Sequence, residues 1–297
     1  MRKKSIFLFF FVTMLIISFM TKKSDGNGSS ERKSDGVTLT LNLSKGKMYQ
    51  MTISVVSDAE MVTNKTDVTE SEMKSMNGQK TTVHTTGTMG YDFEIKDILQ
   101  NGNFLIRTTR KNLKMSQSFG GVSFEYDSET GKSSGMNQNM TDYIKKTIGQ
   151  WIETELDKNS KIISSISSDP SLSNPMDDVA SVFSGNKVKV GDSWVTDRDA
   201  NIKSMTGILI ATVKTNFKLV SLKDGVAELS FDGNYQIKEA AEGTKLSGLQ
   251  SGKTKIDMAT GLPKEIIMDQ EFDIVGMNKN GVALPTKMKN KITIEIK

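Results

Sequence analysis

Asn-Gly and Asp-Gly pairs between runs of alternating apolar and polar residues constrain the fold of this chain more than any other feature. Three such pairs lie at residues 98–104 (ILQNGNF), 222–227 (LKDGVA) and 277–283 (MNKNGVA). These dipeptides suit the positive φ angles of two-residue hairpin turns. Strands joined by such turns are antiparallel neighbours. The pattern therefore predicts a β-rich chain whose C-terminal third is an antiparallel meander.

The same alternation locates the expected strands. Val37, Leu39 and Leu41 alternate with polar residues, which is the period of a half-buried strand. The expected strands are residues 37–44, 48–56, 91–98, 103–117, 121–127, 160–167, 205–221, 225–239, 243–258, 263–276 and 282–296.

Two polar stretches interrupt this rhythm. Residues 61–90 are rich in threonine, and we predict long exposed strands there around a mobile loop at 71–80. Residues 169–190 carry two prolines among several serines and asparagines, which predicts a loop. One short helical turn is expected within that loop, at residues 176–183.

Residues 140–156 (MTDYIKKTIGQWIETEL) form the one long stretch with a clear amphipathic helical pattern. Its apolar residues recur three or four positions apart, which places them on one helix face. They are Met140, Tyr143, Ile144, Ile148, Trp151, Ile152 and Leu156. A single helix of this kind in a β-rich chain is expected to lie across the sheet and bury that face.

The aromatic-rich face of this helix is the candidate ligand site. It comprises Tyr143, Ile144, Ile148, Trp151 and Ile152. The face either plugs the sheet as part of a filled core, or covers a hydrophobic cavity that holds a lipid-like molecule. The pattern is compatible with both interpretations.

The N-terminal residues 1–20 have the features of a signal sequence. Three basic residues precede an apolar stretch of about 15 residues, shorter than the roughly 20 that span a bilayer. Residues 21–36 read as a flexible tether, and residues 37–297 as a single β-rich domain. We therefore expect export to the periplasm or cell envelope of a bacterium. Membrane association is expected only through the N-terminal segment, if that segment is not cleaved.

Composition excludes several classes of function. The formal charge of +4 falls to +1 without the three basic residues of positions 1–20, a poor footprint for nucleic acid. The chain has no cysteine, so disulfides, thiolate nucleophiles and cysteine-bound metals are excluded. The acidic residues and the 18 methionines form no recognisable metal site. No cofactor-binding motif is present.

Two features invite a catalytic interpretation. The single histidine, His84, lies in a threonine-rich run and reads as an exposed strand residue. Gly191-Asp192-Ser193-Trp194 resembles the Gly-Asp-Ser block of a family of lipases and esterases. A serine nucleophile needs a base, and no histidine follows this block. We interpret it as a turn into a strand, with Trp194 anchored in the core, and predict no catalytic residues.

Three short motifs together are similar to a known family. They are Leu41-x-Leu43-x-Lys45-Gly46-x-x-Tyr49, Val190-Gly191-Asp192-Ser193-Trp194 and Ser251-Gly252-x-x-x-Ile256-Asp257-x-x-Thr260-Gly261-Leu262. The chain resembles a family of exported, often lipid-anchored proteins of Bacteroidota-type bacteria with a domain of unknown function. The resemblance spans most of residues 37–297 and implies a location and a fold type, but no activity. Thr21 stands where members usually carry the lipid-bearing cysteine.

These observations predict a mainly β protein. Its large antiparallel sheet is strongly curved or a partly closed barrel, with the helix at 140–156 packed on the concave face. The expected function is non-enzymatic binding of a hydrophobic, lipid-like ligand or of an envelope protein. The alternatives are a structural or interaction protein with a filled core, and a hydrolase that uses only carboxylates.

Overall fold

A computed structural model describes residues 36–62, 80–169, 172–179, 182–204, 207–240, 242–277 and 283–297. Of the described residues, 67% are in strands and 6% are in helices. The described strands are β1 (Val37–Thr38), β2 (Met48–Val62), β3 (Lys80–Ile98), β4 (Phe104–Phe119), β5 (Val122–Asp127), β6 (Lys132–Ser134), β7 (Trp151–Leu156), β8 (Ile162–Ser167), β9 (Lys187–Val188), β10 (Ser193–Ser204), β11 (Gly207–Lys223), β12 (Val226–Glu239), β13 (Lys245–Asp257), β14 (Pro263–Met277) and β15 (Ala283–Ile296). The described helices are α1 (Gln138–Thr147) and the 3₁₀ helix η2 (Pro175–Asp178).

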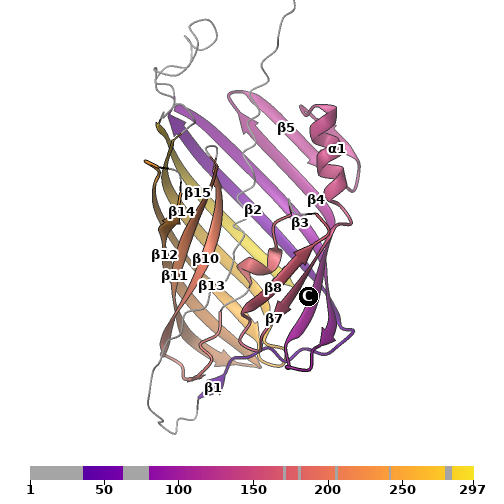
Figure 1. Ribbon diagram of the computed structural model, residues 1–297, viewed down its shortest axis with the longest axis vertical. Helices are drawn as coiled ribbons and strands as arrows, with labels where there is room; N and C mark the ends of the chain where they lie inside the picture. Colours follow the sequence, from indigo (N-terminus) through magenta and orange to yellow (C-terminus); the bar gives the residue numbers. More distant parts are fainter. Residues whose placement is uncertain are drawn as a thin grey trace, which may run out of the picture.

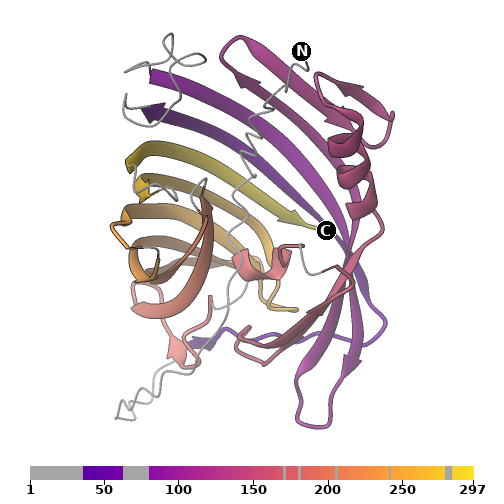
Figure 2. The ribbon, with the colours of Figure 1, turned by 45° about the horizontal axis from the view of Figure 1, so that its top comes forward.

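One antiparallel sheet dominates the fold. Within the described residues it has 13 strands, in the order β10-β11-β12-β13-β14-β15-β2-β3-β4-β5-β6, with β7 and β8 attached through β4. The sheet is strongly curved but is not closed into a barrel (Figures 1 and 2). Strands β10 to β15 form a continuous meander, as predicted. The predicted curved antiparallel sheet is therefore confirmed.

Strand β4 forks the sheet. Its residues 114–119 pair with β5, whereas residues 104–109 pair with β7. Between the two branches, Arg110 exchanges backbone hydrogen bonds with the turn that follows α1: its N–H donates to Gln150 O (3.0 Å), and Gly149 N–H donates to its carbonyl (2.8 Å). The branch β5–β6 and the branch β7–β8 therefore diverge on either side of this point.

The predicted helix at 140–156 is wrong in its second half. Asn137 caps α1 by accepting a hydrogen bond from Met140 N–H (2.9 Å), and the helix ends at Thr147. Gly149 adopts a φ of +82°, which only glycine tolerates easily, and turns the chain. Residues 151–156 then alternate between half-buried and buried positions and join the sheet as β7. Apolar residues of a helix and of a strand thus formed one apparent helical stripe.

Several other predictions from the sequence can be compared with the structure, and two concern residues that the structure does not describe. The strand expected at 205–221 is confirmed as β11, and it pairs with β10, of which only the turn into a strand at residues 191–194 was predicted. The loop at 169–190 contains η2 and β9, so its short helical turn is confirmed near the predicted place. Residues 1–35 and the loop at 71–79 lie outside the described residues. Among the described residues, no helix is long and apolar enough to cross a membrane.

A glycine in the turn between β13 and β14 allows residues 38–43 to pack closely against that turn. Gly261 has a φ of +74°, and a Cβ built there would lie 2.1 Å from the carbonyl oxygen of Thr40. We expect Gly261→Ala to displace residues 38–43 and to cost at least about 2 kcal/mol more than Gly46→Ala. Gly46 is the matched control, because its φ is +78° but no atom lies within 4 Å of its Cβ position. Thermal unfolding and amide exchange at Leu41 would measure the difference, and equal losses in both variants would contradict the contact.

Candidate functional site

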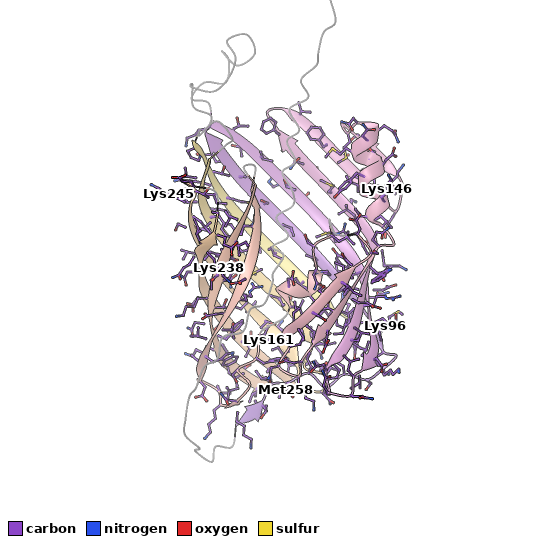
Figure 3. The ribbon with its side chains drawn as sticks, in the orientation of Figure 1. Lys96, Lys146, Lys161, Lys238, Lys245 and Met258 are labelled. Atoms are coloured by element: carbon purple, nitrogen blue, oxygen red, sulfur yellow. The ribbon has the colours of Figure 1, made fainter. Side chains whose placement is uncertain are left out.

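The concave face of the sheet carries two apolar clusters. The larger cluster includes Met51, Phe93 and Ile106, together with the inward residues of α1. The smaller cluster includes Val83, Val213 and Phe272. Charged side chains such as Lys146, Lys238 and Lys245 are exposed at the periphery (Figure 3). The apolar side chains of the sheet therefore gather on its concave face.

A row of uncharged polar side chains separates the two clusters. We call it the polar belt; its members are Thr215, Gln250, Gln270, Asn290, Ser57, Thr85 and Gln117, each 9% exposed or less. Cross-strand pairing places them side by side: Gln250 opposite Gln270, then Asn290, Ser57, Thr85 and Gln117 in turn. The next inward residues along β14, Met268 and Phe272, are buried and apolar on either side. The belt is thus a polar stripe with apolar side chains on both sides. We call the curved, apolar inner face of the sheet the trough.

The belt is held by side-chain hydrogen bonds. Tyr235 donates to Gln250 Oε1 (2.8 Å) and accepts from Gln270 Nε2 (2.8 Å). Gln250 Nε2 in turn donates to Thr215 Oγ1 (2.8 Å), across Gly233 on the intervening strand. A Cβ at Gly233 would lie 3.2 Å from Gln250 Nε2, so glycine leaves space for that reach. Buried polar groups are stable only when bonded in this way.

Removing the hydroxyl of Tyr235 tests the belt. Tyr235→Phe leaves a buried acceptor on Gln250 and a buried donor on Gln270 without this partner. We expect the free energy of unfolding to fall by about 2–4 kcal/mol, measured by urea denaturation. Tyr49→Phe is the control, because Tyr49 keeps its edge contact with Phe93 (ring centroids 5.9 Å apart) and lies outside the belt. A loss no larger than in the control would show that the network adds no stability.

A short segment fills the trough beside the belt. We call residues 172–179 and 182–183 the plug; η2 forms its centre and lies inside the curve of the sheet (Figure 2). Met176, Val179 and Val182 are 6% exposed or less and belong to the larger cluster. Side-chain hydrogen bonds tie the plug to the sheet. Asn174 Nδ2 donates to Thr154 Oγ1 (2.9 Å) and to Ser165 Oγ (3.3 Å). Arg198 Nη1 donates to Asp177 O (2.7 Å), and Trp194 Nε1 donates to Val182 O (3.0 Å).

A small cavity remains beneath the plug. Its volume is about 30 Å³, room for about one water molecule. It is lined by Val182, Thr196, Arg198, Thr215, Phe217, Phe231, Gln250, Thr254, Ile266 and Met268. Trp194 stacks on Phe217 (5.9 Å between centroids), and Phe217 contacts Phe231 (5.5 Å). The buried hydroxyl oxygen of Thr254 has no hydrogen-bond partner within the described part of the chain. Removing the plug would therefore expose the aromatic and hydroxyl side chains that line this cavity.

Two larger clefts lie elsewhere on the protein. One, of about 510 Å³, lies at the rim, between residues 38–43 and the turn that carries Met258 (labelled in Figure 3). The other, of about 530 Å³, includes the exposed side chain of Leu249 with Asp269 and Glu271. Neither of these clefts is lined by the aromatic residues beneath the plug.

The predicted ligand face is divided by the structure. Ile144 is buried, and Ile148 packs with it against the larger cluster. Tyr143 is 44% exposed. Trp151 and Ile152 are adjacent on β7 and therefore point to opposite faces of the sheet, Ile152 being buried. The prediction that all five share one face is wrong, because they belong to two elements.

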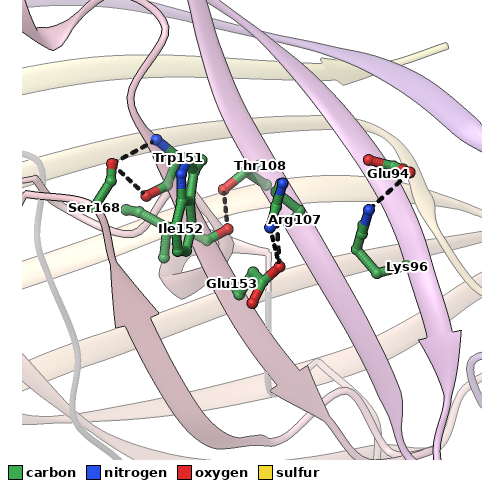
Figure 4. Close-up of polar contacts among 8 residues, drawn as sticks. All are labelled: Glu94, Lys96, Arg107, Thr108, Trp151, Ile152, Glu153 and Ser168. Carbon is green, nitrogen blue, oxygen red and sulfur yellow. Dashed lines mark hydrogen bonds and ion pairs between the residues drawn. The ribbon is translucent and has the colours of Figure 1, made fainter.

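Trp151 takes part in an ion-pair cluster on β4 and β7. The guanidinium carbon of Arg107 lies 4.6 Å from the centroid of the Trp151 ring. Arg107 Nε and Nη2 both donate to Glu153 Oε1, at 2.9 and 2.6 Å (Figure 4). The cluster pins β7 against β4 through a charge-assisted contact. It accounts for Trp151 without a ligand.

The two features with a catalytic appearance have structural explanations. His84 is exposed, and its Nδ1 lies 2.7 Å from Asp58 Oδ1. Ser118 is opposite His84 on β4, but no hydrogen bond joins their side chains within the described parts of these strands. Gly191, with a φ of +97°, turns the chain into β10, and Trp194 packs on Phe217. The described residues also contain no group of three His, Cys, Asp or Glu that could hold a metal ion.

Comparison with known proteins identifies a family match over one third of the chain. The model of a family of unknown function (DUF6263) matches residues 165–263, from β8 to the start of β14. The resemblance to a family with a domain of unknown function is thus confirmed, whereas its Bacteroidota-type origin and lipid anchor stay predictions. A search of curated proteins finds no match.

A solved structure is also similar in part. It is the crystal structure of an outer membrane channel from Pseudomonas putida F1, 9% identical, with 90% of this chain and 100% of that chain covered and a TM-score of 0.22. A likeness at that score supports no argument about this protein.

Proposed function

We propose that the protein binds an apolar or amphiphilic small molecule on the concave face of its sheet, in the space that the plug now occupies, and does so without catalysis. One observation carries this proposal. The sheet stays open, and the larger apolar cluster on its inner face is covered in part by a short segment rather than by its own strands. β proteins that hold one lipid-like ligand enclose it on such a face.

The way in which the plug is attached supports its replacement by a ligand on the inner face of the sheet. Two of these side-chain hydrogen bonds, those from Arg198 and Trp194, end on carbonyl oxygens of the plug backbone. Such bonds constrain the path of the plug but not its side chains. The apolar side chains Met176 and Val179 occupy the trough as an apolar ligand would. A bound molecule would therefore replace contacts of the same chemical kind.

The features of residues 1–20 place this activity outside the cytoplasm in our proposal. A signal sequence and a flexible tether would deliver the domain to the periplasm or cell envelope, where amphiphilic molecules need carriers. An envelope protein is the alternative partner. A permanently filled interior is the second candidate function class, and the cavity of only about 30 Å³ favours it.

Native mass spectrometry of the full-length gene product, purified from an exporting host, tests the proposal. A reproducible added mass that disappears on organic extraction is expected, and extracted protein should then take up a dansyl-labelled fatty acid. A clean mass together with no uptake of the probe would overturn ligand binding and leave the filled core.

A further inference from the structure

Arg110 is a cation on the inner face of the fork. It lies on β4 between the branches that pair with β5 and β7, opposite Tyr91 on β3. At the same place, the register of β3 and β4 shifts between Gly90 and Tyr91, which indicates a β-bulge. Bulges of this kind often re-aim side chains beside binding sites. The side chain of Arg110 is only 9% exposed.

The partners of Arg110 are neutral. Its Nη2 donates to the hydroxyl of Tyr91 (3.2 Å), and its guanidinium carbon lies 5.6 Å from the centroid of the Tyr91 ring. Its Nε is buried and has no hydrogen-bond partner among the described residues. No carboxylate of the described chain forms an ion pair with it. Lys145 and Lys146, in the last turn of nearby α1, add further positive charge.

Arg107, three residues earlier on the same strand, shows what a structural arginine looks like here. It is paired with Glu153 through two hydrogen bonds. An arginine cannot lose its charge in a protein, and a buried charge without a counter-ion is strongly unfavourable. The buried Nε–H of Arg110 is a donor that awaits an acceptor. The contrast indicates that the counter-ion of Arg110 lies outside the described residues.

We propose that Arg110 binds the oxyanion head group of an anionic, single-chain amphiphile. This inference rests on the proposed function and names the chemistry of its ligand: a carboxylate or a phosphate monoester on an apolar tail. Guanidinium groups suit both oxyanions. Tyr91, which contacts Arg110, and Met89, whose sulfur accepts a hydrogen bond from the Tyr91 hydroxyl (3.5 Å), belong to the larger apolar cluster, as the plug does. A tail in the plug space and a head at the fork would therefore occupy one continuous surface.

Three probes of equal chain length test the head group: dodecanoate, dodecyl phosphate and dodecanol, each titrated into the delipidated full-length protein by calorimetry. Both anions are expected to bind at least about tenfold more tightly than the alcohol, the effect of one hydrogen bond to a charged group. Arg110→Gln should weaken both anions by about ten- to a hundredfold and leave the alcohol unchanged. Arg107→Gln is the matched control and should change none of the three affinities.

The outcomes separate this inference from the proposed function. Equal affinities for the three probes, or anion affinities that survive Arg110→Gln, would overturn the role of Arg110 while leaving amphiphile binding intact. No binding of any probe would overturn the proposed function and this inference with it. Without ligand, the Tm of Arg110→Gln should equal or exceed that of the wild type, because an uncompensated charge is removed. If Arg110→Gln fails to fold, Arg110→Lys keeps the charge and should retain a weakened preference for the anions; loss of folding in both variants would identify Arg110 as structural and overturn the inference.

Discussion

Replacing Met176 with aspartate should release the plug from the concave face. Met176 has no exposed surface, and a carboxylate in its place would be buried without a counter-ion in the larger apolar cluster. The plug is expected to detach, with a loss of about 3–5 kcal/mol in the free energy of unfolding, comparable to deleting a large core side chain. Binding of an apolar dye should rise at least about tenfold, whereas the far-ultraviolet circular dichroism of the sheet should be retained.

A matched variant and a ligand measurement complete this test. Met48→Asp places the same charge on a methionine that is 60% exposed, and it should leave stability and dye binding unchanged. Under the proposed function, Met176→Asp should also bind the dansyl-labelled fatty acid more tightly, because the plug no longer competes for the site. Loss of the sheet signal would instead show that the plug is an integral part of a filled core.

Replacing Gly252 with valine should abolish the folded state. A Cβ at this position on β13 would lie 2.1 Å from the carbonyl oxygen of Ile267 and 2.6 Å from Cζ of Phe231. The first contact is with backbone, so the strand pairing with β14 would have to move. We expect a loss of at least about 4 kcal/mol, measured by urea denaturation, or no soluble protein.

The neighbouring residue is the control for Gly252. Ser251→Val introduces the same side chain on the same strand, but Ser251 is exposed and points to the other face. Its stability should change by less than about 0.5 kcal/mol. Similar losses in both variants would show that strand β13 tolerates no valine, rather than that Phe231 and Ile267 need the space of a glycine.

Hairpins were the most predictable part of the fold, because their geometry is local. Asp224 and Gly225 have φ angles of +51° and +73°, as the sequence Asp-Gly in a two-residue turn requires. Gly102 likewise has a φ of +81°. Each such turn joins strands that are adjacent in sequence, so the meander follows from short stretches of chain.

The division of residues 140–156 was not predictable from periodicity. Trp151, Ile152 and Leu156 fit a helical spacing and a strand equally well over so few residues. Their assignment depends on β4, which offers an unpaired edge to residues 151–156. That edge is available because β5 pairs only with residues 114–119 of β4 and leaves residues 104–109 to β7. The candidate ligand face of the sequence was divided for the same reason.

The sequence alone determined the alternation, the turns, and therefore the class of the fold. The tertiary structure decided which inward residues meet. Gln250, Gln270 and Asn290 each occupy inward strand positions, but only the register of three strands aligns them into a belt. The surroundings of Arg110 and of the plug likewise depend on the fork of β4 and on the curvature of the sheet. Side-chain direction along a strand is a local property with a period of two, whereas register depends on pairings between distant segments.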